Sequence, residues 1–204
     1  MERRPGDVGY WEDAYVRADT GWDLGVPAPP IVSLVDGRRD LVRPGRALVV
    51  GCGRGHDALA LASRGFSVIA LDWSPSAARE ARARLTGEAG PPRVLRGDVR
   101  RLPVATASVD HVVEHTCFCA LDPADRPLYV REVARVLRPG GLLFGLFYEP
   151  AAPQNPPFTT SEAELRGLFG AAFDLAVLER ARDSIERRAG RELLAAFVRR
   201  NATG

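Results

Sequence analysis

The sequence contains no lysine. All 28 basic residues are arginine, and 26 acidic residues oppose them, so the formal net charge is only +2. The exclusive use of arginine indicates a coding bias rather than a binding signal. A charge this close to zero gives no reason to expect a nucleic-acid or membrane partner, because both attract proteins through a strong excess of basic residues.

Cysteine and long apolar runs are also scarce. The three cysteines, Cys52, Cys117 and Cys119, supply neither a disulfide framework nor the four ligands of a structural zinc site. No apolar run approaches the roughly 20 residues of a membrane span, and the polar start of the chain is unlike a signal peptide. We therefore expect a cytoplasmic protein without a metal ion.

The most informative stretch predicts a strand, a glycine-rich turn and a helix in succession. Residues 48–50 form an apolar run typical of a buried strand, and residues 57–62 have helical spacing. Three glycines lie between them: Gly51, Gly53 and Gly55. Glycines allow a tight turn and a close approach to a ligand, and a dinucleotide-binding fingerprint would need a further one where His56 stands. The shorter spacing resembles the first motif of class I S-adenosylmethionine (SAM) methyltransferases.

Acidic residues follow the next two predicted strands. The strand at residues 67–71 ends in Asp72, about 20 residues after the first glycine, where a carboxylate can accept both hydroxyls of a ribose. The strand at residues 93–96 precedes Asp98 and Val99. Asp98 could accept the exocyclic amine of an adenine, with Val99 against the ring. The alternative is that Asp98 caps a turn.

Helices and strands alternate along most of the chain, whose 204 residues suit one soluble domain with a substantial core. Helices are expected at residues 31–42, 74–85 and 122–137, the last ending in a glycine cap at 138–141, and a capping box at 161–164 opens another. Further strands are expected at residues 108–113, 142–148, 173–178 and 193–199. This order predicts a doubly wound α/β fold, with a mostly parallel seven-stranded sheet, an antiparallel edge and ligands at the carboxyl ends of the strands.

Residues 1–30 carry four aromatic side chains ahead of the first strand: Tyr10, Trp11, Tyr15 and Trp22. Residues 10–17 can form a short helix. The aromatic residues either pack on the surface of the domain or cover the ligand as a lid that excludes water. We divide the chain into an N-terminal helical lid at 1–30 and a catalytic domain at 31–204, within one domain overall.

Several motifs in order resemble the thiopurine S-methyltransferase-like family, which includes thiol, halide and thiocyanate methyltransferases. They lie at residues 11–15, 20–22, 50–58, 114–121, 125–127, 156–158 and 165–169. The resemblance covers nearly the whole chain from Trp11 onward. It implies a monomeric SAM-dependent methyltransferase that moves a methyl group to a small soft nucleophile by in-line displacement, producing S-adenosylhomocysteine.

The resemblance also assigns roles by position. The cofactor-binding residues would be Trp11, Trp22, Gly51, Cys52, Gly53, Gly55, Asp72, Trp73, Asp98, Val99 and His115. The acceptor-binding residues would be Tyr15, Phe118, Phe158 and Arg187. Arg187 resembles a family arginine that can meet an anionic acceptor. We assign no general acid or base, because a halide or chalcogen anion needs none and a thiol reacts as its thiolate.

Two other functions stay open. Residues 155–158 spell the catalytic Asn-Pro-Pro-Phe of nucleic-acid amino-methyltransferases, so an amino-methyltransferase acting on nucleic acid or protein is one alternative. In that class the tetrapeptide follows the fourth strand, whereas Asn155 comes after the fifth. The second alternative is a SAM-binding protein without catalytic activity.

Overall fold

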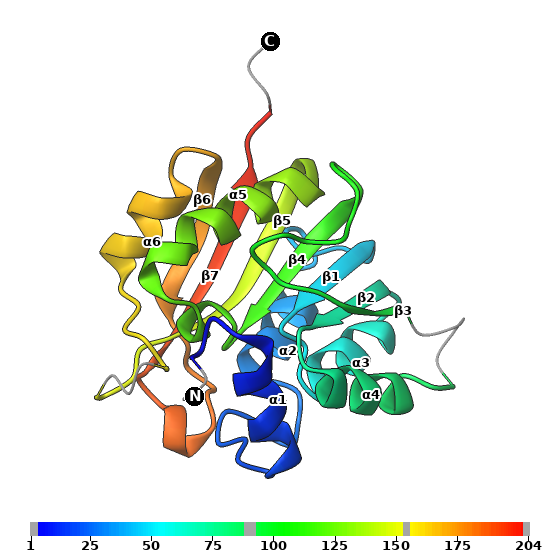
Figure 1. Cartoon of the computed structure of the whole chain (residues 1–204). Coiled ribbons are helices and arrows are strands. Elements are labelled where there is room, and N and C mark those ends of the chain that lie inside the picture. Colours follow the sequence, from blue (N-terminus) through cyan, green and yellow to red (C-terminus); the bar gives the residue numbers. More distant parts are fainter. Residues whose placement is uncertain (1–3, 88–92, 153–155, 202–204) are drawn as a thin grey trace.

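The computed structural model describes residues 4–87, 93–152 and 156–201. Seven strands form one sheet in the order β3-β2-β1-β4-β5-β7-β6 (Figure 1). Their bounds are β1 Arg46–Val50, β2 Ser67–Asp72, β3 Arg93–Arg96, β4 Val109–His115, β5 Leu137–Tyr148, β6 Phe173–Arg180 and β7 Glu192–Arg199. The first five strands pair in parallel, and β7 runs antiparallel to both β5 and β6. The predicted doubly wound sheet with an antiparallel edge is confirmed.

Helices cover both faces of the sheet (Figure 1). Their bounds are α1 Val8–Val16, α2 Pro29–Gly37, α3 His56–Ala62, α4 Pro75–Arg84, α5 Arg126–Val136 and α6 Glu162–Phe169, with 3-10 turns η1 Phe118–Ala120, η2 Pro123–Asp125 and η3 Glu186–Arg188. Side chains of α5 and α6 share one apolar cluster with the strands, and those of α2, α3 and α4 share the other. The central strands are buried on both faces, as their apolar runs predict.

Local signals place most helix starts correctly. The Ser74 hydroxyl accepts the Ala77 N–H at 3.1 Å, and Pro75 begins α4. The Ser161 hydroxyl likewise accepts the Glu164 N–H at 3.2 Å. The Glu164 carboxylate, however, pairs with Arg126 instead of closing the capping box.

Two predicted helix ends are wrong. The helix expected at residues 31–42 spans Pro29–Gly37 and ends at its glycine, although Val42 is still buried in the same core. The glycine cap expected at 138–141 does not end α5. Leu137 is already extended, because its fully buried side chain belongs to the core and its backbone pairs with Val109.

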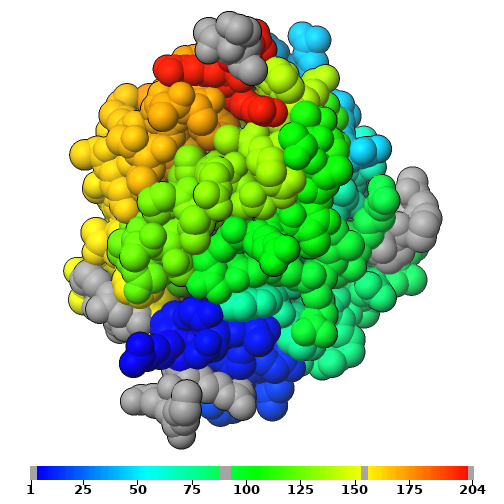
Figure 2. Space-filling model, turned by 45° about the horizontal axis from the view of Figure 1, so that its top comes forward, coloured from blue at the N-terminus to red at the C-terminus, as the bar shows by residue number. Residues whose placement is uncertain are grey.

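The N-terminal segment, residues 4–30 of the described chain, lies against the edge of the sheet where the parallel strands end (Figure 1). Figure 2 shows part of it, in blue, on the lower part of the molecular surface. Glu12 of α1 anchors it: its carboxylate accepts hydrogen bonds from the Ser74 hydroxyl at 2.6 Å and from the Ser76 hydroxyl and N–H at 2.6 and 3.0 Å. The segment is thus held against the start of α4. None of the helices in the described ranges has the length and apolar content needed to cross a membrane.

Candidate active site

A cavity of about 500 Å³ lies at the carboxyl ends of the parallel strands, beneath the N-terminal segment. The segments that follow β1, β2, β3 and β4 and the end of β5 all contribute to its wall. Lining residues include Trp11, Tyr15, Trp22, Gly51, Asp72, Trp73, Asp98, Val99, Cys117, Cys119, Tyr148, Arg187 and Arg188. A smaller cavity of about 40 Å³ shares Tyr15, Trp22 and Gly51 with it and adds Cys52, Gly53 and His115. The fold therefore gathers most of the predicted site residues at one place.

The glycine turn after β1 is shaped by what approaches it. Gly51 has φ +55°, and a Cβ there would lie 2.8 Å from the Cβ of Cys117. Gly53 has φ +52°, and a Cβ there would lie 3.0 Å from the Tyr15 hydroxyl. Gly55 serves another purpose, because a Cβ there would meet Ala81 of α4 at 3.1 Å. The first two glycines thus let the Cys117 and Tyr15 side chains approach the turn, and the third lets α3 and α4 pack closely.

Asp72 ends β2 and points its carboxylate at this turn. It accepts the Gly53 N–H at 2.8 Å and the Ser74 N–H at 2.9 Å. The side chain is 8% exposed, and burial raises the pKa of Asp72 to about 6. The carboxylate therefore both fixes the turn and faces the cavity.

Asp98 also lies on the cavity wall, but its oxygens already have a partner. The guanidinium of Arg100 donates to both of them at 2.7 to 3.0 Å, and the Arg100 N–H donates to one at 2.8 Å. The latter bond is the turn cap that the sequence left open as an alternative. Arg100 further donates to Asp125 at 2.6 Å and lies 5.0 Å from the ring of Trp73. Arg100 thus joins the segments after β2 and β3 to the loop before α5.

The aromatic residues of the N-terminal segment pack into one cluster above the glycine turn. The rings of Trp11 and Trp22 meet edge to face with centroids 5.5 Å apart, and the Trp22 indole N–H donates to the Tyr15 hydroxyl at 3.3 Å. Trp11 donates its own indole N–H to the Pro5 carbonyl at 2.9 Å. Burial raises the pKa of Tyr15, which stays a neutral phenol.

His115, the last residue of β4, has a partner at each ring nitrogen. Its Nδ1 lies 2.7 Å from Asp57, and its Nε2 lies 3.1 Å from a guanidinium nitrogen of Arg188. Because arginine only donates, Nε2 must accept, which places the ring proton on Nδ1, where it is donated to Asp57. Both ring nitrogens of His115 are therefore engaged in hydrogen bonds.

Glu114 is fully buried just before it. Its carboxylate accepts the Cys117 and Phe118 N–H groups at 2.8 and 2.7 Å and the Tyr129 hydroxyl at 2.8 Å. Burial raises the pKa of Glu114 to about 7. These bonds shape the loop after β4 that lines the cavity, including Thr116, which has a φ of +59°. Glu114 thus supports the cavity wall from behind.

The two phenylalanines expected to bind the acceptor do not line the cavity. Phe118 is fully buried, and its ring packs against Tyr129 and Phe147 with centroids 5.6 and 5.4 Å away. Phe158 is half-buried, and its N–H donates to the Cys119 carbonyl at 2.7 Å. Its neighbours Pro156 and Pro157 lie on the cavity wall instead.

The arginines after β6 contact the N-terminal segment. Arg187 donates to the Gly21 and Asp23 carbonyls at 2.6 and 2.8 Å, and Arg188 donates to the carbonyl of Trp22 between them. Arg187 is exposed, whereas Arg188 is 4% exposed. The guanidinium of Arg187, which the sequence analysis expected at an anionic acceptor, thus holds two backbone carbonyls.

Comparison with known proteins shows the family of this chain. The model of the thiopurine S-methyltransferase family matches residues 7–201. The chain belongs to the thiopurine S-methyltransferase family. Thiocyanate methyltransferase 1 of Arabidopsis thaliana is 32% identical over 201 residues, covering 96% of this chain and 86% of the relative. Probable thiol methyltransferase 2 of the same plant is 34% identical, covering 76% of this chain and 69% of the relative.

A solved structure supports the fold. Burkholderia thailandensis 1,6-didemethyltoxoflavin-N1-methyltransferase, with bound 1,6-didemethyltoxoflavin and S-adenosylhomocysteine, has a TM-score of 0.75 at 21% identity and covers 95% of this chain and 87% of that chain. Together with the family match, it makes the chain a SAM-dependent methyltransferase with a class I fold.

The three cysteines of this methyltransferase all line a cavity: Cys117 and Cys119 line the main one, and Cys52 lines the smaller one. Burial raises the pKa of each thiol, so they stay protonated at neutral pH. In the part of the chain that the structure describes, no three His, Cys, Asp or Glu side chains are grouped to hold a metal ion. The site is built instead from backbone turns, carboxylates and aromatic rings.

Arg100 and Arg188 line the main cavity, and the sequence analysis missed both of them. The Asp-Val-Arg spacing at 98–100 offers a weak signal for the first, since it suits a carboxylate and a guanidinium two residues apart. Arg188 has no such signal. It is one of four arginines in the connection before β7, and only the three-dimensional structure shows that it is the buried one.

Proposed function

We propose that this methyltransferase moves the methyl group of SAM to a small soft nucleophile, either a thiol, a thiopurine or a halide, thiocyanate or chalcogen anion, by in-line displacement. The observation that carries the proposal is the cavity of about 500 Å³. Its wall includes Gly51 of the glycine turn, Asp72 and Val99 together with Cys119 and Tyr148. Cavities of about 300–1,000 Å³ suit one ligand of drug size. A cofactor as large as SAM therefore leaves room for only a small acceptor.

The residues present fit SAM. Gly51 and Gly53 give the turn its positive φ angles on the cavity walls, where a ligand would lie against the backbone. The Asp72 carboxylate would accept the ribose hydroxyls, and Val99 would pack on the adenine ring. Asp98 would act at the adenine end together with Arg100, its partner. When bound, SAM supplies a methyl group already activated on a cationic sulfonium.

The remaining assigned residues complete this proposal. Trp11 and Trp22 would cover the cofactor, and Trp73 would border its adenosine part, while Cys52 and His115 line the small cavity where its methionine part would lie. Gly55 would contribute through helix packing. Of the residues assigned to the acceptor, Tyr15 and Arg187 line the main cavity. Phe118 and Phe158 do not line the cavity and would contribute by packing behind the residues that do.

No side chain needs to act as a general base. Both ring nitrogens of His115 are occupied, and the Glu114 carboxylate is committed to three hydrogen bonds. The acceptor would therefore react in a form that is already nucleophilic, a thiolate or another soft anion. Transfer from a sulfonium to an anion cancels charge, so excluding water favours the transition state over the separated ions. The work of this chain is to align the acceptor and keep the site dry.

We further propose that residues 1–30 act as a lid on a catalytic domain at 31–204, in a cytoplasmic monomer without a nucleic-acid partner. The aromatic cluster above the glycine turn and the small net charge support this. Asn155, on which the amino-methyltransferase alternative depends, lies outside the described residues.

The test is an assay of S-adenosylhomocysteine release with one acceptor at a time. The panel comprises iodide, hydrosulfide, thiocyanate, aromatic thiols, thiopurines and selenite, with amines as the control class. We expect turnover with at least one sulfur, selenium or halide acceptor and none with amines. Turnover confined to amines would support the amino-methyltransferase, and tight SAM binding without turnover on the whole panel would support an inactive binder.

A further inference from the structure

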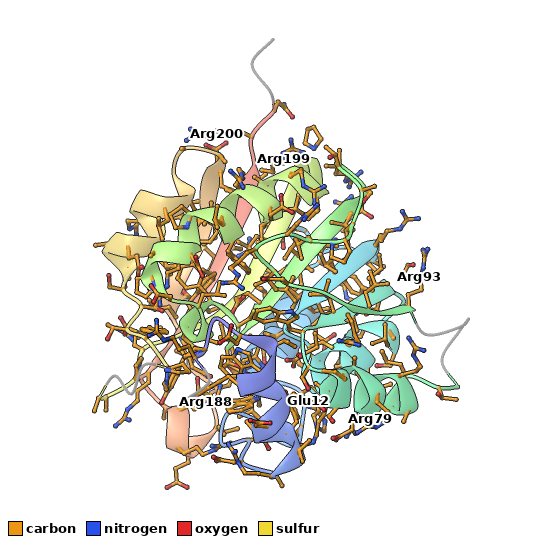
Figure 3. The ribbon with its side chains drawn as sticks, in the orientation of Figure 1. Glu12, Arg79, Arg93, Arg188, Arg199 and Arg200 are labelled. Carbon is orange, nitrogen blue, oxygen red and sulfur yellow. The ribbon has the colours of Figure 1, made fainter. Side chains whose placement is uncertain are left out.

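Among the arginines that the structure describes, Arg188 alone contacts the ends of three neighbouring strands. It belongs to the turn η3, between β6 and β7, and lies beside the N-terminal segment (Figure 3). Its side chain is nevertheless buried and lines the main cavity. Three of its partners come from neighbouring strands of the sheet. They are His115 at the end of β4, Tyr148 at the end of β5 and Glu192 at the start of β7.

The contacts use different parts of one planar group. One terminal nitrogen donates to His115 Nε2 and to the Glu192 carboxylate, both at 3.1 Å, and the other donates to the Trp22 carbonyl. The guanidinium carbon lies 5.2 Å from the centre of the Tyr148 ring. Glu192 is 2% exposed, so the charge of Arg188 is balanced inside the protein. A lysine could keep this charge, but its single nitrogen could not replace the two separated terminal nitrogens that reach Glu192 and the Trp22 carbonyl.

Through the Trp22 carbonyl, Arg188 is connected to the aromatic cluster of Trp11, Tyr15 and Trp22. We call this cluster the aromatic cover. The Trp22 ring contacts both Trp11 and Tyr15, and the Tyr15 hydroxyl approaches the glycine turn. Asp57, the partner of His115, also accepts the Ala28 N–H at 2.7 Å, where the N-terminal segment ends. Two points of the segment, at Trp22 and Ala28, are therefore bound to one hydrogen-bonded chain that passes through His115 and Arg188.

We propose that Arg188 is a positioning residue that sets the aromatic cover of the N-terminal segment relative to the cavity wall. It joins the Trp22 carbonyl to the ends of β4, β5 and β7, so that cover and cavity wall are assembled as one unit. The inference rests on the proposed placement of SAM beneath Trp11 and Trp22. Misplacement of reacting groups by about 1 Å can lower a rate roughly 100-fold, so a loosened cover should lower kcat.

The experiment compares Arg188→Lys and Arg188→Met with Arg191→Met. Arg191 is an exposed arginine of the same connection, and its side chain has no hydrogen bond or ion pair to the described residues. Each variant is measured for melting temperature, for kcat and KM with the best acceptor of the panel, and for tryptic cleavage near Arg17 with and without S-adenosylhomocysteine.

We expect Arg188→Lys to melt close to wild type, because the pair with Glu192 is kept, but to lose about 10-fold or more in kcat and to be cleaved several-fold faster. Arg191→Met should match wild type in every readout. If Arg188→Lys has the kcat and the tryptic cleavage rate of wild type, Arg188 serves only as the charge partner of Glu192. If Arg188→Lys melts far below wild type, Arg188 is needed for the stability of the fold. Either result overturns the inference.

The two proposals can fail separately. If wild type turns over no acceptor of the panel, the proposed function fails. The cleavage rates still decide whether Arg188 holds the segment in place, since they need no acceptor.

Discussion

Asp72→Asn tests how the cavity binds its cofactor. The wild-type carboxylate is buried, holds the glycine turn through Gly53 and Ser74 and faces the cavity. Replacing a charged acceptor of the ribose hydroxyls by an amide should cost about 1–3 kcal/mol of binding free energy. This corresponds to roughly 5- to 150-fold weaker binding of S-adenosylhomocysteine. Calorimetric titration at pH 7.5 measures it, with Asp174→Asn, an exposed carboxylate on β6, as the matched control.

The pH dependence of the same site gives a second readout. Burial raises the pKa of Asp72 to about 6, so the carboxylate is charged at pH 7.5 and mostly protonated at pH 5. Wild-type affinity for S-adenosylhomocysteine should therefore fall as the pH drops below 6, while that of Asp72→Asn stays flat. Equal affinities of wild type and variant at both pH values would remove Asp72 from the site.

The free energy of unfolding should change with pH in the direction opposite to the affinity for S-adenosylhomocysteine. Because the folded state binds the proton of Asp72 more tightly than the unfolded chain, the free energy of unfolding should decrease as pH rises from about 4 to above 6. A pKa rise of about two units corresponds to about 3 kcal/mol. Asp72→Asn should lack this part of the pH dependence in denaturant titrations. A variant that loses stability in parallel with wild type would contradict the assignment.

Three further substitutions test other parts of the structure. Gly51→Ala places a Cβ 2.8 Å from Cys117 at positive φ and should cost more than about 1 kcal/mol of stability and weaken S-adenosylhomocysteine binding at least 10-fold, as denaturant and calorimetric titrations would show. Glu114→Gln should raise the melting temperature at pH 8.5 and leave it unchanged at pH 5, because burial raises the pKa of Glu114 to about 7 and the charged form is unfavourable in the fold. Arg187→Ala should speed tryptic cleavage near Arg17 and leave acceptor KM unchanged, since its guanidinium holds two carbonyls of the N-terminal segment.

For each of these three substitutions, one result would contradict the prediction. Gly37→Ala, at a glycine with open space, is the control for Gly51→Ala, and equal effects of the two would refute the steric argument. A lower melting temperature of Glu114→Gln at both pH values would mean that the carboxylate stabilises the loop after β4. A raised KM for anionic acceptors alone in Arg187→Ala would restore the acceptor contact that the family resemblance implies.

Local signals in the sequence were enough for much of the fold. The glycine turn, the Ser74 cap and the buried strands depend on residues a few positions apart, so their patterns predicted them well. The exception at Leu137 shows the limit, since tertiary burial of one side chain overrode the glycine cap. Phe118 shows another, because its sequence neighbours do not reveal that its ring points into the core and away from the cavity.

Long-range contacts of the site could not be predicted. Arg188 meets Trp22 and His115 across 166 and 73 residues of sequence, and Arg100 meets Asp125 across 25. Each pair depends on the order of the strands and on how the N-terminal segment crosses their ends. A single sequence contains no signal that selects these arginines from 28 basic residues.

The central claim is that this chain methylates a small soft nucleophile rather than an amine. The most direct measurement is a competition in which SAM with a deuterated methyl group is offered an equimolar mixture of the acceptors named above together with amines. Mass spectrometry then identifies which products carry the label. We predict the label on sulfur, selenium or halide products alone. Labelled amine products, or none at all while SAM binds, would contradict the account.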